Sequence, residues 1–200
     1  NKIVNQAPAQ YNLHVNMMGK AAHAGGAPEK GINALTVAAH AIGNMKLGRI
    51  DAETTSNIGT VEGGLATNIV MPSVFLKCEA RSLDNEKLEI QVKHMVDTFH
   101  ASAAAFGATA DIKILPMYLA HITEPTHPFA VEVKEVMDTF MEDVEFVSAG
   151  GGSDGNVMFH KGINCLLVSA GLNKPHTLDE FVDLETFYNS TEFLIRYLTK

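Results

Sequence analysis

The first residue that could do chemistry is His23, which lies among small residues in the stretch 19–25. This stretch falls between a predicted strand and a predicted helix, and small neighbours leave an imidazole exposed instead of packed. An exposed imidazole can donate a hydrogen bond to a developing oxyanion or bind a carboxylate. A solvated loop histidine without a function is the alternative, and composition alone does not separate the two.

Arg81 is the second candidate, because it ends a predicted strand in which alternate residues are apolar. Side chains alternate along a strand, so Arg81 projects from the face opposite to the apolar one. A guanidinium on an open face can hold a carboxylate through two parallel hydrogen bonds. An ordinary surface pair with Glu79 or Asp84 is the alternative.

A glycine run at residues 150–152 leads into a predicted helix that begins near Ser153. Glycines let a ligand approach the backbone, and the first N–H groups of a helix can bind an anion. The run matches neither the phosphate-binding Gly-Lys-Ser/Thr loop nor a dinucleotide fingerprint, which argues against a nucleotide. A tight turn in which Ser153 or Asp154 caps the helix is the alternative.

His176 follows a predicted buried strand and has carboxylates three and four residues later, at Asp179 and Glu180. Neighbouring carboxylates often support a metal-ligating histidine in this way. A single histidine does not make a metal site, and an isolated histidine is more often structural or solvated. Histidines inside the predicted strands and helices, among them His14 and His160, are assigned no function.

The elements that would position the first two candidates form a split βαβ arrangement. Alternating apolar residues predict strands, and apolar residues at helical spacing predict helices. The predicted strands lie near residues 11–17, 54–61, 73–81 and 110–114, and the helices near 34–45 and 85–106. This order predicts an α+β domain: a four-stranded, mostly antiparallel sheet with both helices on one face and the other face open.

Beyond a predicted linker at residues 119–127, the pattern is α/β in style. Helices are predicted near 129–141, from 153 and at 184–198, with strands at 144–147 and 164–169. Two strands are too few for a sheet covered on both faces, so this segment is expected to need partner strands from outside the chain. We therefore expect two domains, 1–118 and 119–200, of which the second is an incomplete α/β segment.

Composition argues against several classes of partner. The formal charge of −8 comes without a cluster of Lys and Arg, so nucleic acid is not expected as a partner. No apolar stretch approaches the roughly 20 residues of a membrane helix, so no membrane association is expected. Cys78 and Cys165 are far apart in apolar runs, which predicts reduced core cysteines in a cytoplasmic protein. The start at Asn1, without Met, is typical of a processed product or a fragment.

Five stretches, in this order, carry a resemblance to a known family: GKAAHAGGAPEKGINAL, GGLATNIV, EARSLDNEKLE, GGGSDGNVMFHKGI and HTLDEFV. Together they resemble the tripeptidase T-like branch of the dinuclear-zinc aminopeptidase, carboxypeptidase and aminoacylase superfamily. The resemblance runs from about residue 8 to the C-terminus. It implies that domain 1–118 is a lid, or dimerisation, domain and that domain 119–200 is the C-terminal part of a catalytic domain.

The resemblance also implies roles for residues of the lid. His23 matches the lid histidine that reaches the active site of the partner subunit and stabilises the tetrahedral intermediate. Asn68 and Arg81 match groups that hold the substrate, and Arg81 would hold its terminal carboxylate. A homodimer formed through the lid is therefore expected.

In the second segment, the resemblance matches His176 to the last zinc ligand. The loop that lines the cleft and binds substrate is matched by Gly151, Gly152, Ser153 and Asp154. The family's His-x-Asp pair, bridging Asp and adjacent Glu residues have no counterpart in this sequence. One histidine cannot hold two zinc ions, so the chain alone is expected to be inactive.

The resemblance therefore implies that the intact protein hydrolyses amide bonds in small peptides with two zinc ions, or with cobalt or manganese. An N-acyl amino acid deacylase is the alternative among enzymes. A non-catalytic dimerisation or ligand-sensing module is the alternative outside them. The sequence upstream of Asn1 would discriminate the enzyme from the module.

Overall fold

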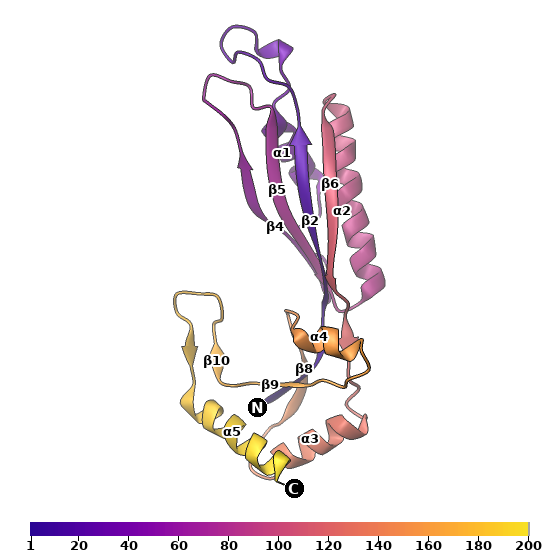
Figure 1. Cartoon of the computed structure of the whole chain (residues 1–200), viewed down its shortest axis with the longest axis vertical. Helices are drawn as coiled ribbons and strands as arrows, with labels where there is room; N and C mark the ends of the chain where they lie inside the picture. The colour runs from indigo at the N-terminus through magenta and orange to yellow at the C-terminus, as the bar shows by residue number, and fades with distance from the viewer. Residues whose placement is uncertain (200) are drawn as a thin grey trace. The chain divides into compact units, whose positions relative to one another are not determined.

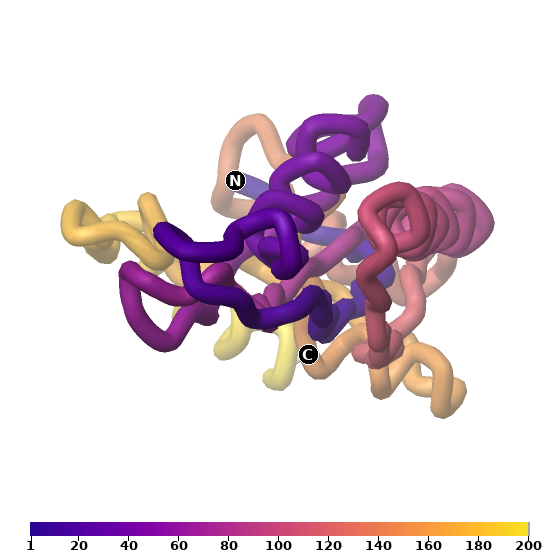
Figure 2. Tube along the Cα trace, turned by 90° about the horizontal axis from the view of Figure 1, so that it is seen from above, coloured from indigo at the N-terminus to yellow at the C-terminus, as the bar shows by residue number. Residues whose placement is uncertain are grey.

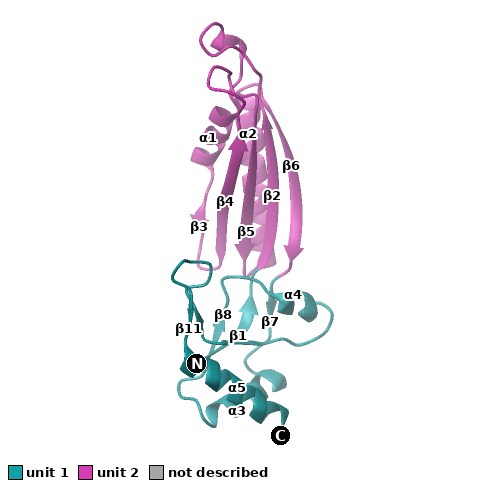
Figure 3. Ribbon diagram, turned by 60° about the vertical axis from the view of Figure 1, so that its left-hand side comes forward, with its two compact units in different colours: residues 1–8, 120–200 teal, residues 9–119 magenta. Residues whose placement is uncertain are grey.

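The computed structural model describes residues 1–199, which form two compact units (Figure 3). Unit 2 is Ala9–Leu119, and unit 1 combines Asn1–Pro8 with the chain from Ala120 onward. The predicted domain 1–118 placed residues 1–8 together with the sheet of unit 2. These residues pack instead with the C-terminal segment, because their strand pairs there.

Unit 2 is an antiparallel sheet with two helices on one face (Figure 1). The strand order is β3-β4-β5-β2-β6, and all neighbouring strands are antiparallel. The four long strands keep the predicted split βαβ order, and the two-residue β3 adds an edge strand that the pattern did not predict. The bounds are β2 (Ala9–Met18), α1 (Ala34–Asn44), β3 (Gly48–Arg49), β4 (Thr54–Gly63), β5 (Ser73–Ser82), α2 (Asn85–Ala105) and β6 (Thr109–Tyr118).

The helices lie on the apolar face that alternation predicts. Alternate residues of β2 and β5 are buried together with one stripe of each helix, for example Leu13, Leu76, Val37 and Phe99. In the view from above, α1 and α2 lie next to each other (Figure 2). Because this face is filled, the polar residues of the same strands must line the other face, which no helix of unit 2 covers (Figure 1).

Unit 1 is organised around β1 (Lys2–Ala7), which the sequence analysis did not predict. Strand β1 pairs parallel with β8 (Glu145–Ser148) and antiparallel with β7 (His121–Ile122) and β9 (Leu167–Val168). The predicted linker therefore contains a strand. The expectation that this segment finds no partner strand within the chain is wrong, because β1 is such a partner.

The helices of unit 1 cover one apolar cluster. The cluster consists of Ile3, Val133, Val136, Met137, Met141, Val144 and Phe193. It joins β1 to α3 (Pro128–Asp138) and α5 (Leu184–Leu198), and α5 has the predicted bounds. Helix α3 ends earlier than predicted, because the N–H groups of Thr139 and Phe140 turn back to the carbonyls of Val136 and Met137. The remaining elements are α4 (Asp154–Phe159) and the hairpin β10 (Leu172–Asn173) and β11 (Phe181–Val182).

Both cysteines are free thiols, in agreement with the sequence analysis. Cys78 is a core residue, and burial raises the pKa of its thiol to about 12. Cys165 is only half-buried, so it is not the core residue that its apolar neighbours predicted. Across residues 1–199, none of the helices combines the length and the apolar character needed to cross a membrane.

Candidate functional site

The loop that carries His23 is fixed by backbone pairing with two other segments of unit 2. Lys20 pairs with Ile32, and His23 itself pairs with Ile69. The N–H of Ala24 also donates to the carbonyl of Asn68 at 2.9 Å. The structure thus places the loops of His23 and Asn68 side by side, and both side chains are exposed.

A glycine allows this close approach of three segments. A Cβ on Gly31 would lie 2.9 Å from Ala22 Cβ and from Val70 Cγ1, and 3.0 Å from the carbonyl oxygen of Lys20. A side chain at position 31 would therefore push the His23 loop away from its neighbours.

The imidazole of His23 has its hydrogen-bonding pattern set by its own loop. The backbone N–H groups of Gly25 and Gly26 donate to His23 Nδ1 at 3.1 and 3.0 Å. An accepting Nδ1 carries no proton, so in the neutral ring the proton is on Nε2. The loop therefore leaves Nε2–H as the donor of the neutral ring, and such a donor is what oxyanion stabilisation requires.

Arg81 lies on the open face of the sheet, as alternation predicted. Its guanidinium forms two parallel hydrogen bonds with Glu79, from Nε to Oε1 at 3.1 Å and from Nη2 to Oε2 at 2.9 Å. Both side chains are about one-third exposed. The structure therefore shows the pair with Glu79 that was the alternative to a carboxylate-binding role for Arg81. A bound carboxylate would have to replace or join Glu79.

Arg81 does not lie beside His23 within one copy of unit 2. The His23 loop joins β5 at its first end, where the N–H of Gly19 donates to the carbonyl of Pro72. Arg81 is at the other end of β5, which corresponds to a separation of roughly 25 Å. One substrate could not contact both side chains in a single unit 2.

The glycine-rich loop of unit 1 ends in a helix cap. Ser153 Oγ accepts a hydrogen bond from the N–H of Gly155 at 3.1 Å, and the N–H of Ser153 donates to Asn156 Oδ1 at 2.9 Å. The predicted capping alternative is therefore present. Gly151 and Gly152 precede the cap and are half-buried, whereas Asp154 is exposed in the first turn of α4.

Asn156 is a residue whose part in this loop the sequence analysis missed. It is fully buried, and besides holding the N–H of Ser153 it donates from Nδ2 to the carbonyl of Pro8 at 3.0 Å. The capping spacing between Ser153 and Asn156 is a signal that could have found the first contact. The contact with Pro8 depends on the fold.

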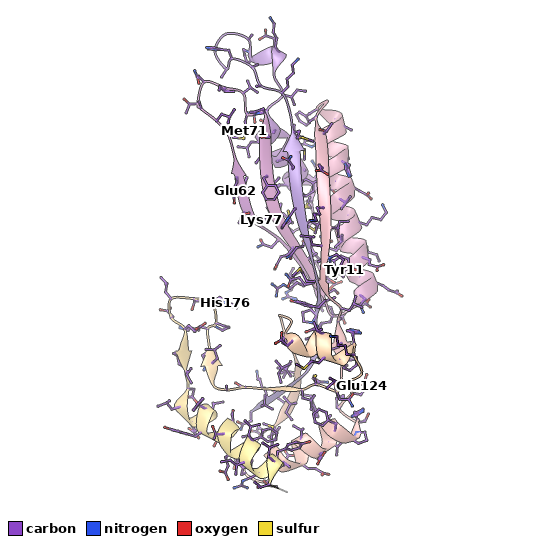
Figure 4. The ribbon with its side chains drawn as sticks, viewed as in Figure 1. Tyr11, Glu62, Met71, Lys77, Glu124 and His176 are labelled. Carbon is purple, nitrogen blue, oxygen red and sulfur yellow. The ribbon has the colours of Figure 1, made fainter. Side chains whose placement is uncertain are left out.

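His176 lies in the loop of the β10–β11 hairpin, where it is exposed (Figure 4). Its φ of 65° is in the left-handed region, and its N–H donates to Glu180 Oε2 at 2.8 Å. Glu180 therefore compensates a conformation that a non-glycine residue rarely adopts. At the base of the hairpin, hydrogen bonds from the backbone and side chain of Thr186 hold the pKa of Asp183 below its ordinary value.

A metal site is not complete among residues 1–199. No group of three or more His, Cys, Asp or Glu side chains in that range could hold a metal ion. Near His176, Glu180 is engaged with the backbone, and Asp179 lies 3.9 Å from Lys174. His176 is thus a single donor, which does not fit a dinuclear zinc site by itself.

The geometry can be compared with known proteins. Residues 10–106 match the M20 family described as "Peptidase dimerisation domain". The structure superposes on aminopeptidase PepT from Bacillus cereus ATCC 10987 with a TM-score of 0.88 and 39% identity, over 98% of this chain and 52% of that one. A tripeptidase from Staphylococcus aureus gives a TM-score of 0.90 and 33% identity, over 98% and 52%.

A curated relative gives the same coverage. The uncharacterized protein YqjE of Bacillus subtilis (strain 168) is 39% identical over 193 residues, which is 96% of this chain and 52% of that protein. The chain therefore spans about half the length of the proteins to which it is similar here.

Proposed function

Because residues 10–106 belong to the M20 peptidase dimerisation domain family, we propose that the intact protein is a homodimeric metallopeptidase acting on small peptides. Unit 2 would be its lid and unit 1 part of its catalytic domain. The similarity to an aminopeptidase and to a tripeptidase along nearly the whole chain supports this proposal. A tripeptide is the substrate that we would test first.

The observation that carries the proposal is the orientation of His23. Two backbone N–H groups leave Nε2 as the donor of the neutral ring, and His23 is an exposed residue. In the proposed reaction, Nε2–H donates to the oxygen of the scissile carbonyl as negative charge develops on it. Such a preorganised donor stabilises the transition state more than the ground state.

The separation of His23 from Arg81 supports a dimer. Both are proposed to contact one substrate, His23 at the scissile carbonyl and Arg81 at the terminal carboxylate. They lie roughly 25 Å or more apart along one unit 2. We therefore propose that His23 serves the active site of the second subunit, so that each site combines residues from both chains.

Unit 1 would supply His176 as one metal ligand and the loop of Gly151, Gly152, Ser153 and Asp154 at the cleft. Residues 1–199 do not complete the metal site, so the proposal of two zinc ions, or of cobalt or manganese, rests on the family resemblance.

Helix α5 also exposes apolar side chains on a second stripe, including Leu184, Tyr188 and Ile195. A further part of the intact protein would cover this stripe.

The proposal is tested by His23→Ala in the intact, metal-loaded protein, with a tripeptide as substrate. We expect kcat to fall by roughly 10²–10³ while KM changes little, because the lost hydrogen bond forms mainly in the transition state. The matched control is His100→Ala, on the exposed surface of α2, which should leave both constants unchanged. A near-normal kcat for His23→Ala would remove His23 from the mechanism.

The same assay separates the alternatives. A deacylase would cleave N-acetyl amino acids faster than tripeptides in the presence of zinc or cobalt. A dimerisation or ligand-sensing module would cleave neither, although it would still form dimers. Cleavage of tripeptides that depends on added metal supports the peptidase.

A further inference from the structure

We propose that the open face of the unit 2 sheet binds a small carboxylate-bearing molecule, such as a free amino acid or a dipeptide, beside Lys77 and His14. This site lies mid-sheet, apart from the His23 loop, and it goes beyond the proposed hydrolysis. Figure 4 shows Lys77 on β5.

The open face contains a shallow pocket of about 330 Å³, which is within the range of small-ligand sites. Three neighbouring strands line it: β2 with Gln10, Asn12 and His14, β4 with Asn57 and Gly59, and β5 with Lys77, Cys78 and Glu79. The pairing of β4 with β5 shifts register between Ile58 and Thr60, so Gly59 is an extra residue without a side chain. The hollow therefore results from a bulge at a glycine.

Basic side chains cross the sheet in one row at this pocket. His14 is paired with Lys77 on β5 and with Lys113 on β6. Directly paired residues have Cβ atoms about 5 Å apart, so the two ammonium groups flank one imidazole. Lys77 and Lys113 are on the two strands that flank β2, roughly 10 Å apart, and both lie on the same face of the sheet as His14.

The carboxylates on this face lie beside the row of His14, Lys77 and Lys113 and not within it. The Lys77 ammonium nitrogen lies 6.0 Å from the centre of the Phe75 ring. Neither Lys77 nor Lys113 forms an ion pair with another described residue. Three carboxylates lie one row away: Glu62 opposite Phe75, Asp111 opposite Asn16, and Glu79 opposite Asn12. The Lys77 ammonium group therefore remains available to a ligand in the pocket.

Glu79, the carboxylate in the pocket lining, pairs with Arg81 and not with Lys77. Both of its oxygens accept hydrogen bonds from Arg81, and Oε2 also accepts one from Gln10 at 3.3 Å. Gln10 is held in turn by Tyr118, whose hydroxyl donates to its carbonyl oxygen at 2.5 Å. Glu79 thus pairs with Arg81 at one end of the pocket, and the donors left for a ligand are those of Lys77, His14, Asn12 and Asn57.

The ligand that fits has one carboxylate and a small polar body. Its carboxylate would accept hydrogen bonds from the Lys77 ammonium and the His14 ring, which are charge-assisted contacts. The amide side chains of Asn57 and Asn12 could bind the amine or peptide group. A larger molecule would extend beyond the pocket.

The experiment is a titration of the 200-residue chain, labelled with ¹⁵N, at constant ionic strength. The probes are acetate, glycylglycine and glycinamide, of which the last has no carboxylate. We expect acetate and glycylglycine to shift the amide signals of Asn12, His14 and Lys77 in a saturable manner, and glycinamide to have no such effect. Chloride exchanged for acetate should not reproduce the shifts, and equal shifts with chloride would reduce the site to general anion screening and overturn the proposal.

Two variants test the position of the site. Lys77→Met should weaken acetate binding by roughly five- to tenfold, because it removes the charged donor. Gly59→Leu should abolish binding by filling the hollow; a Cβ there lies 3.8 Å or more from its neighbours, so the fold should be kept. The control Lys93→Met, on exposed α2, should bind as the parent chain does. Absence of saturable shifts in the parent chain, or unchanged binding in both pocket variants, would overturn the proposal without affecting the proposed hydrolysis.

Discussion

Both ring nitrogens of His121 lack a hydrogen-bond partner among residues 1–199, although only 4% of the residue is exposed. Its ring packs against Phe159, with 5.1 Å between the ring centroids. Burial lowers the pKa of His121, and the nearby His160 lowers it further. The folded protein therefore holds this imidazole neutral at a pH where an unfolded chain would protonate it.

The sign of the resulting pH dependence follows from proton binding. Below the ordinary histidine pKa of about 6.5, the unfolded chain binds more protons at His121 than the folded one, so stability decreases as the pH falls. Well above that value His121 is neutral in both states and contributes no slope. We expect urea unfolding of unit 1 to show lower stability at pH 5 than at pH 7, and His121→Phe to reduce this difference. The control His100→Gln, on the exposed surface of α2, should leave this difference in stability unchanged. If His121→Phe showed the same difference as the parent chain, His121 would not be the cause of the pH dependence.

At the same scale, the candidate site was only partly predictable. The exposure of His23 follows from its small neighbours, and the pair of Arg81 with Glu79 follows from side chains two residues apart on one strand face. The tautomer of His23 could not be predicted, because it depends on a turn that aims the N–H groups of Gly25 and Gly26 at one nitrogen. The bridge from Asn156 to Pro8 joins residues 148 positions apart and has no local signal.

At the scale of elements, the His23 loop requires the close fit at Gly31. An added methyl group would meet Ala22, Val70 and the backbone of Lys20 at or below 3.0 Å. We expect Gly31→Ala to lower the free energy of unfolding of unit 2 by about 1–3 kcal/mol, as other overpacked sites do, and to displace the loop. Chemical denaturation of the chain measures the first effect, and the amide shifts of residues 19–26 measure the second.

The matched control is a glycine with open space. A Cβ on Gly43, near the end of α1, would meet nothing within 4 Å. Gly43→Ala should therefore stabilise the chain by about 0.5–1 kcal/mol, because alanine favours the helix. If both substitutions had the same effect, close packing at Gly31 would not be the reason.

Elements whose apolar residues recur at a regular spacing were predicted best. The bounds of α5 follow from its helical spacing, and the sheet of unit 2 follows from alternation in β2 and β5. Strand β1 was missed because its partners β8 and β9 lie more than a hundred residues later in the chain. One of its inward positions is also polar: Asn5 is buried and donates to the carbonyl of Thr123 at 3.0 Å.

For the whole molecule, the His23 loop lies at the first end of β5 and Arg81 lies at the other end. This separation leads to a specific prediction about assembly. If the intact protein is a dimer in which His23 serves the second subunit, two different inactive variants can complement each other. His23→Ala chains retain His176, and His176→Ala chains retain His23. A dimer of one chain of each kind therefore contains one site with both residues, whereas neither homodimer contains any.

Mixing equal amounts of the two purified variants under conditions that exchange subunits should therefore restore activity. Random pairing places half of the dimers in the mixed form with one working site of two, so about a quarter of the parent activity is expected. Sedimentation before and after exchange checks that the dimers persist. If His23 acted within its own chain, each subunit of the mixed dimer would lack one residue of its site, and the mixture would stay as inactive as its components. The size of the recovered activity thus decides whether one copy of unit 2 serves its own active site or that of its partner.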